Sequence, residues 1–490
     1  MRTSPAPARL LGRIWSALPL VLSMAVILPG LVAGQATDFE SPVRLNVTSN
    51  SAAAAESFWI GLDHAENLFP NAAREGFEEA LRLDPEFGMA HVVHGAFSPR
   101  LTREERDEHI AAGFALLADA PTVELLTALG LRARSNGNQA EARTHLESAR
   151  KLAPGDPHLA FWVAQATNTV DGPQAGIGEF RKVTQQFPDY APAWNILAYQ
   201  SWRTGDREGA LQAVQTYVGL ASDHRNGHDS FAEILQWAGR WNEAAGHYQQ
   251  AIEIDPGYQG AFNGLAELAQ LRGDGEAARS FLARGAEAAT TPTGALNARR
   301  AIATSFFMDG DVDEALELLG EVASEAQAAE LTTPARLAHQ QAALVSGAVG
   351  NADEAEAHLS AAWDLGGENT PLQAVVTAVA MADAGDLMTA REAHTEFADA
   401  VGDQANWQSL LSASQGVIAV ESGDFEGAAK ILAVADPDFN LVQALLAESH
   451  DELGNESQAR NLAHAVVNDG QVNLYNIFTG SAWVRAAALR

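Results

Sequence analysis

The stretch GRWNEAAGHYQQAIEIDPGYQGAFNGLAEL, from Gly239 to Leu268, contains the pattern from which the fold can be read. It places an alanine five residues after Gly239, at Ala244, and closes with Pro256. The same pair, written G-x4-A, recurs in step along the chain, and its nine occurrences are Gly137/Ala142, Gly205/Ala210, Gly239/Ala244, Gly273/Ala278, Gly310/Ala315, Gly350/Ala355, Gly385/Ala390, Gly423/Ala428 and Gly454/Ala459. Successive glycines from Gly205 onward lie 34, 34, 37, 40, 35, 38 and 31 residues apart. The chain therefore carries a long internal repeat.

Helix chemistry explains why these residues recur. Each glycine follows a helical pattern, where a left-handed cap is cheapest without a Cβ atom. An Asp or Asn often follows, and its side chain can accept from the free N–H groups that open the next helix. The positions concerned are Asp206, Asp274, Asp311, Asn351, Asp386, Asp424 and Asn455. The alanine then falls one turn into the second helix, where a small side chain allows close packing, and Tyr248 and Ala251 continue the same face. Each repeat is therefore predicted to be an antiparallel helix pair.

This pattern resembles the tetratricopeptide repeat family. The residues that carry the resemblance are Ala232, Leu235, Ala244, Tyr248, Ala251 and Pro256 in 225–258, Gly61, Ala73, Phe77, Ala80 and Pro85 in 54–87, and Trp194, Leu197 and Ala210 in 191–224. The resemblance covers about residues 54–470. It implies an all-α fold, a right-handed α-solenoid of about twelve antiparallel helix pairs.

The repeat also suggests how the chain is divided. Threonine, proline and glycine interrupt the helical pattern at Ala289–Ala295. We expect an N-terminal array over 37–290, a divergent C-terminal array over 291–470, and a capping helix over 471–490. A single continuous superhelix is the alternative. Beyond Gly310 the spacing stretches and the closing prolines are mostly lost, so repeat boundaries there are open.

The N-terminus has the layout of a secretory signal peptide. Arg2, Arg9 and Arg13 precede an apolar run over 14–32, and AGQA then supplies small residues. We expect cleavage after Ala36 and a periplasmic or secreted protein. An uncleaved membrane anchor is the alternative, although Pro19 and Pro29 disfavour a spanning helix. No later segment is apolar enough to span a bilayer.

Composition and motifs exclude several classes of function. The formal net charge of −32 argues against nucleic acid as a partner, because phosphate binding needs clustered positive charge. The absence of cysteine excludes disulfides, thiolate nucleophiles and Cys-ligated zinc. No phosphate-binding loop, HExxH, EF-hand loop or GxSxG elbow occurs. The best metal candidate, Asp223, His224, His228 and Asp229, spans a predicted turn rather than one helix. We therefore expect no catalytic residue, no metal and no cofactor.

The resemblance places the candidate site on the first helix of each pair. In this family the first helices line a concave groove that commonly takes peptides or partner segments. The inward positions that we select are Asn195, Tyr199, Trp202, Asp229, Glu233, Asn263 and Glu267. Amide, acidic and aromatic side chains suit an extended peptide, including one that carries Arg or Lys. The alternative is that these are solvated positions on a polar helix face.

Two further observations bear on function. In the second half of the chain the inward positions become apolar, as at Leu344, Val375 and Val417, which indicates either a slipped register or an apolar groove. Repeats occupy essentially all of the chain after Ala36, which leaves no room for a catalytic domain. The sequence therefore predicts an exported, non-enzymatic scaffold that binds a protein or peptide partner for envelope assembly or secretion. The alternative is a small-ligand or glycan carrier that stacks sugars on Trp202 and Trp237.

Overall fold

The fold is all-α in the computed structural model, which describes residues 45–98, 101–366, 371–402, 404, 407–435, 439–468, 473, 474, 476 and 478–489. Among these residues there are 25 helices and no strand. The predicted signal peptide over 1–36 lies outside the described residues. No helix in the described part is long and apolar enough to cross a membrane.

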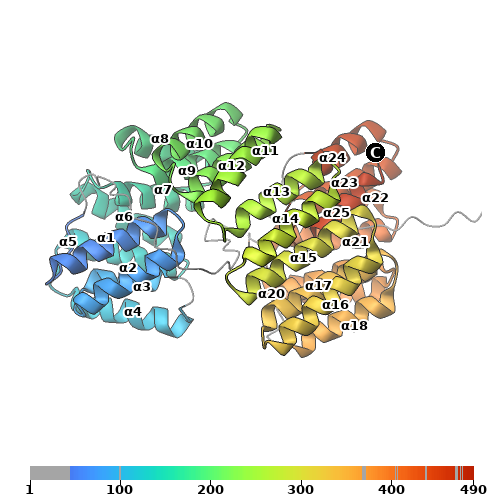
Figure 1. The fold of residues 1–490 in the computed structure, drawn as a ribbon, viewed down its shortest axis with the longest axis horizontal. Helices are drawn as coiled ribbons and strands as arrows, with labels where there is room; N and C mark the ends of the chain where they lie inside the picture. The colour runs from blue at the N-terminus through green and yellow to red at the C-terminus, as the bar shows by residue number, and fades with distance from the viewer. Residues whose placement is uncertain are drawn as a thin grey trace, which may run out of the picture. The chain divides into compact units, whose positions relative to one another are not determined.

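The described chain forms two compact units, which divide between Ile234 and Leu235 and are treated separately (Figure 1). The N-terminal unit (residues 45–234) contains α1 (Ala52–Glu66), α2 (Pro70–Leu83), α3 (Gly88–Phe97), α4 (Arg103–Leu116), α5 (Thr122–Ser135), α6 (Gln139–Leu152), α7 (Pro157–Asp171), α8 (Pro173–Gln186), α9 (Ala191–Arg203) and α10 (Arg207–Leu220). Helix α11 (Arg225–Trp237) crosses the division.

The C-terminal unit (residues 235–489) contains α12 (Trp241–Ile254), α13 (Gln259–Leu271), α14 (Gly275–Ala288), α15 (Pro292–Asp309), α16 (Val312–Ala328), α17 (Thr332–Ala348), α18 (Ala352–Asp364), α19 (Pro371–Asp383), α20 (Leu387–Val401), α21 (Gln408–Glu421), α22 (Phe425–Leu432), α23 (Asn440–Glu452), α24 (Glu456–Asn468) and α25 (Thr479–Ala487). Within each unit, neighbouring helices pack in pairs, and first helices also contact the first helices of adjacent pairs. The predicted solenoid of about twelve helix pairs is confirmed.

The turn inside each pair follows the predicted chemistry. All nine glycines of the G-x4-A pattern have positive φ, between 74° and 93°. Their partner alanines are all buried. At Asp206, Asp274, Asn351, Asp386 and Asp424 the side chain accepts a hydrogen bond from the first turn of the second helix. Asp311 stands at the cap position of α16, but its side chain makes no capping bond.

Two turns reach the left-handed conformation without glycine. Leu68, between α1 and α2, has φ of 64°, and Glu330, between α16 and α17, has φ of 58°. Leu68 lies five residues before the buried Ala73, so it occupies the glycine position of the first pair. The repeat geometry therefore holds even where its signature residue is absent.

Helix length explains the irregular spacing after Gly310. Helices α9 to α14 have 13 or 14 residues, whereas α15, α16 and α17 have 18, 17 and 17. Longer helices shift the inward register, and Leu344, Val375 and Val417 are fully buried in a hydrophobic core. These residues therefore do not form an open apolar groove. A longer helix accounts for the shift at Leu344 of α17, whereas α19 and α21, which carry Val375 and Val417, have 13 and 14 residues.

The expected interruption at Ala289–Ala295 is a short turn between packed helices. Helix α14 ends at Ala288, and the Thr291 side chain caps α15 by accepting from the Gly294 N–H at 3.1 Å. Helices α14 and α15 pack against one another. The array boundaries at 290 and 470 stay predictions.

Candidate partner-binding site

The predicted groove residues of the N-terminal unit connect neighbouring first helices. Asn195, Tyr199 and Trp202 lie on α9, and the Tyr199 hydroxyl donates a hydrogen bond to Glu233 of α11. Asn195, Trp202 and Asp229 are buried. The Arg207 guanidinium lies 3.9 Å from the centre of the Trp202 ring and donates to the Trp202 carbonyl at 2.6 Å. Asn195, Trp202 and Asp229 are therefore not solvated positions on a polar helix face.

In the C-terminal unit, Asn263 and Glu267 of α13 form a similar network. The Asn263 amide donates to one oxygen of Glu267 at 2.6 Å, and the Gln236 amide donates to the other at 3.1 Å. The Tyr248 hydroxyl in turn donates to Gln236 at 3.1 Å. Glu267 is buried, so its charge is held by amide donors rather than by solvent. Partner binding by the seven predicted residues stays a prediction.

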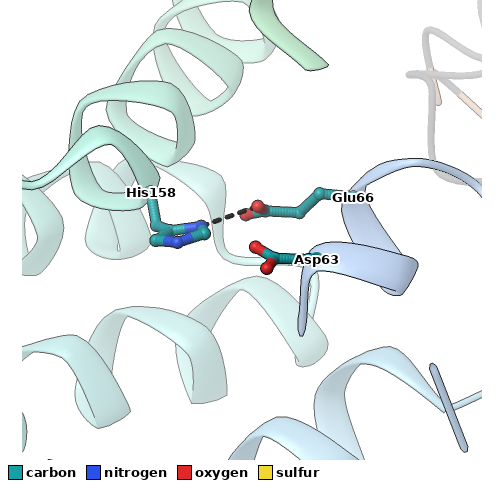
Figure 2. Close-up of side chains that lie close together, drawn as sticks. All are labelled: Asp63, Glu66 and His158. Atoms are coloured by element: carbon teal, nitrogen blue, oxygen red, sulfur yellow. Dashed lines mark hydrogen bonds and ion pairs between the residues drawn. The ribbon is translucent and has the colours of Figure 1, made fainter. Parts of the chain in front are cut away.

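A buried ionic network joins three first helices of the N-terminal unit. Figure 2 shows Asp63 and Glu66 of α1 beside His158 of α7. His158 Nδ1 lies 2.6 Å from a Glu66 oxygen, and both side chains are only 2% exposed. The Tyr190 hydroxyl, at the start of α9, donates to the same Glu66 oxygen at 2.5 Å. Residues far apart in sequence therefore connect α1, α7 and the start of α9.

This network fits a proton better than a metal ion. The candidate ligand atoms of Asp63, Glu66 and His158 lie within 4.8 Å of one another. Burial lowers the pKa of His158, but the charges of Glu66, Asp156 and Asp63 outweigh it and raise the pKa to about 9. A protonated imidazole cannot ligate a cation, and its Nδ1 is already engaged by Glu66. We therefore interpret the cluster as a buried ion pair.

Helix α25 forms the second buried ionic cluster, in the C-terminal unit. It packs against α15, α17, α23 and α24 (Figure 1). Its Arg485 donates to Asp383 at 2.6 Å, to Glu421 at 2.9 Å and also to Glu448. These three acids lie on the successive first helices α19, α21 and α23, and the Arg485 and Asp383 side chains are 1% and 0% exposed. One guanidinium thus connects three repeats.

Burial and the neighbouring charges shift the pKa values of both Arg485 and Asp383. Burial lowers the pKa of Arg485, but Glu448, Asp383 and Glu421 raise it above its ordinary value. Burial raises the pKa of Asp383 well above its usual range, and Arg485 only partly offsets this. Asp383 and Glu421 also end their helices, where the negative end of the helix dipole favours a cation. The inner face at this point is built to hold an arginine.

Apolar packing completes the seat of α25. Ala482 and Ala486 are buried with residues of α23 and α24. A Cβ atom on Gly480 would lie 2.6 Å from the Phe307 ring of α15, so this glycine permits close approach. Helix α25 therefore packs its alanines on α23 and α24 and extends its arginine to α19, α21 and α23.

Sequence reasoning missed both ionic clusters. Their hydrogen-bonded partners lie between 32 and 124 residues apart, and a linear pattern gives no distances at that range. The one available signal was Arg485 in a segment otherwise rich in alanine. The sequence's own metal candidate does not assemble, because His228 Nε2 lies 3.0 Å from the Ser222 carbonyl and Asp223 is exposed at the turn.

Comparison with known proteins identifies the repeat. A family model described as tetratricopeptide repeat matches residues 238–302. No curated protein matches the chain. A solved tetratricopeptide repeat protein from Parabacteroides merdae is 13% identical, over 60% of this chain and 99% of that one, with a TM-score of 0.37. TTC0263 from Thermus thermophilus is 19% identical, over 38% and 98%, with a TM-score of 0.31. YrrB, titled a protein with an unusual peptide-binding site, is 16% identical, over 38% and 96%, with a TM-score of 0.30.

Proposed function

We propose that this chain, which is a tetratricopeptide-repeat protein, is an exported, non-enzymatic scaffold that binds partner proteins on the inner faces of its repeats. The partner segment that we propose is a helix or peptide with an exposed arginine. The signal-peptide layout of residues 1–36 supports export, and the repeat that fills the described chain supports a scaffold rather than an enzyme.

The observation that carries this proposal is the seat of Arg485. Three first helices of consecutive pairs each supply a carboxylate to one guanidinium. Charge-assisted hydrogen bonds of this kind discriminate strongly between partners with and without an arginine, because a partner without the cation leaves the buried acids unpaired. The chain's own α25 thus supplies an intramolecular example of the recognition that we propose for a partner.

The alternative of a glycan carrier has weaker support. Trp202 is buried, and Arg207 covers its ring. A sugar that stacked on this indole would have to displace the arginine. The covered ring therefore counts against sugar stacking on Trp202.

The test measures recognition of α25 in trans. A variant that ends at Asn476 is mixed with a labelled peptide of residues 478–489, and with the same peptide carrying Arg485→Met. We expect the native peptide to bind at least tenfold more tightly, because the methionine leaves the acids without their cation. Equal binding of both peptides by a folded variant would contradict the proposal. If circular dichroism shows that the truncated chain is unfolded, full-length Arg485→Met replaces it as the acceptor.

Export is tested separately. The full chain is expressed in a Gram-negative host, and the cell fractions are probed for the protein. We expect it outside the cytoplasm with a new N-terminus at Thr37, while a variant without residues 1–36 stays in the cytoplasm. A full chain retained in the cytoplasm would refute the export part and leave the binding part to its own test.

A further inference from the structure

Residues 45–50, here called the strap, precede α1 outside any helix or strand and bond to three repeats of the N-terminal unit. The Leu45 N–H donates to Asp156. The Thr48 N–H donates to Glu124 at 3.0 Å, and the Asn50 N–H donates to Asp84 at 2.7 Å. Main-chain donors of one short segment therefore meet acids from three different parts of the fold.

The three acids, here called the carboxylate edge, lie near the starts of α3, α5 and α7, the first helices of consecutive pairs. Asp84 precedes α3, Glu124 lies in the first turn of α5, and Asp156 caps α7. The three donors, Leu45, Thr48 and Asn50, are three and then two residues apart, and they meet Asp156, Glu124 and Asp84 in that order. The strap therefore runs across three helix pairs and presents a main-chain N–H group to one carboxylate of each.

Side chains of the strap add a chemical preference. The Thr48 hydroxyl donates to the second oxygen of Glu124 at 2.7 Å, and the Ser49 hydroxyl donates to Asp84 at 2.7 Å. Leu45 is buried, whereas Asn46 and Asn50 are exposed. The occupant is therefore an extended segment with an apolar residue followed, three and four residues later, by two hydroxyl side chains.

Burial makes these acids depend on their occupant. Glu124, Asp156 and Asp84 are 0%, 2% and 4% exposed. A buried carboxylate without donors is costly, and the strap supplies a donor to each of the three. Asp84 and Asp156 also accept local bonds, from the Glu86 and Leu159 N–H groups, but both oxygens of Glu124 are engaged by Thr48. Without the strap, the carboxylate edge would therefore bind any segment that supplies the same N–H and hydroxyl donors.

We propose that the carboxylate edge is a binding site for an extended, hydroxyl-bearing peptide, and that the strap is its resident ligand, which a partner segment of the same chemistry displaces. The site is separate from the α25 seat, so either proposal can fail alone. It requires an unmodified hydroxyl, because a phosphate in place of the Thr48 hydroxyl would face the Glu124 carboxylate. Displacement must overcome the high effective concentration of a tethered segment. The intact chain should therefore bind such a peptide weakly.

The experiment uses a fluorescent peptide with the sequence of residues 44–51 as the probe. The acceptors are the chain that begins at Thr37, the same chain shortened to begin at Ser51, and the long chain with Thr48→Pro. Proline at this position removes both the N–H and the hydroxyl that Glu124 accepts. Asn46→Pro is the matched control, because Asn46 lies in the strap but its N–H is not one of the three that meet the carboxylate edge.

We expect the shortened chain and the Thr48→Pro chain to bind the probe at least tenfold more tightly than the intact and Asn46→Pro chains. A probe with phosphothreonine at the position of Thr48, or an acceptor that also carries Glu124→Gln, should lose at least tenfold of that binding. Circular dichroism confirms that each acceptor is folded. If a folded Thr48→Pro chain binds no better than the intact chain, the strap is a fixed structural element and the proposal is overturned. Equal binding of the phosphorylated probe would also overturn it.

Discussion

Single glycines set the geometry of each helix pair. Gly205 has φ of 87°, and no atom lies within 4 Å of the place where a Cβ would stand. Gly246 also has open space there, but it lies inside α12. The two positions therefore differ in backbone conformation and not in crowding.

This difference predicts opposite signs for the same substitution. We expect Gly205→Ala to lower the free energy of unfolding by about 1 kcal/mol, because a Cβ is strained in the left-handed region. Gly246→Ala should raise it by about 0.5–1 kcal/mol, since alanine is the better helix former. Urea unfolding followed by circular dichroism measures both. Two changes of equal sign would contradict the assigned backbone conformations.

The His158 network predicts a pH dependence of stability. The folded pKa of about 9 exceeds the ordinary value of 6.5, so the ion pair stabilises fully below pH 6.5 and its contribution is lost as pH rises through 9. The shift corresponds to about 3 kcal/mol. We expect the melting temperature of the native chain to fall between pH 6.5 and 9 by more than that of His158→Gln, which cannot be protonated. Parallel pH profiles of the two proteins would show that the buried pair does not titrate in this range.

Residue patterns predicted the turns but not their exceptions. The nine turn glycines, their buried alanines and five of the Asx caps follow from local chemistry that repeats along the chain. Leu68 could not be predicted, because packing of the first pair holds a non-glycine residue in the left-handed region against its local preference. Asp311 has the right residue type and position without the bond. Local rules therefore fail where tertiary packing decides the geometry.

Among the helices, α25 depends most on a single side chain. We expect Arg485→Met to lower the free energy of unfolding by about 3–5 kcal/mol, because it leaves three buried acids without their cation. Arg460→Met is the matched control on α24, where Arg460 pairs with Glu456 at 3.2 Å on the surface. Arg460→Met should change the free energy of unfolding by no more than about 0.5 kcal/mol. Hydrogen exchange should rise in α25 for the first variant only; unchanged exchange would contradict the assigned role of Arg485.

The helices themselves were predictable, whereas two non-repeating segments were not. Periodicity indicated a helix near the end of the chain. It could not show which helices α25 contacts, because that contact occurs once and leaves no repeated pattern in the sequence. The strap has no helical period and gave no signal at all. Burial of Asn195 and Asp229 was likewise missed, since an inward position was assumed to be open to a partner. Contacts between segments far apart in the sequence decide the positions of α25 and of the strap.

Across the chain as a whole, charge opposes the fold. The formal charge of −32 at pH 7 makes the solenoid repel itself, and salt screens this repulsion. We expect the melting temperature at pH 7 to rise by several degrees between about 10 and 300 mM NaCl. The effect should nearly vanish close to the sequence pI of about 4.7, which serves as the control. A salt effect of equal size at both pH values would point to a cause other than net charge.

The open space around the turn glycines offers a practical route to labelling. Nothing lies within 4 Å of a Cβ at Gly137, Gly205, Gly350 or Gly423. Hairpin tips of this kind tolerate inserted residues, at a cost that grows only slowly with loop length. A short epitope or fluorophore tag placed there would report on individual repeats in cells. Because the chain has no cysteine, one introduced thiol would also be the sole attachment point for a dye.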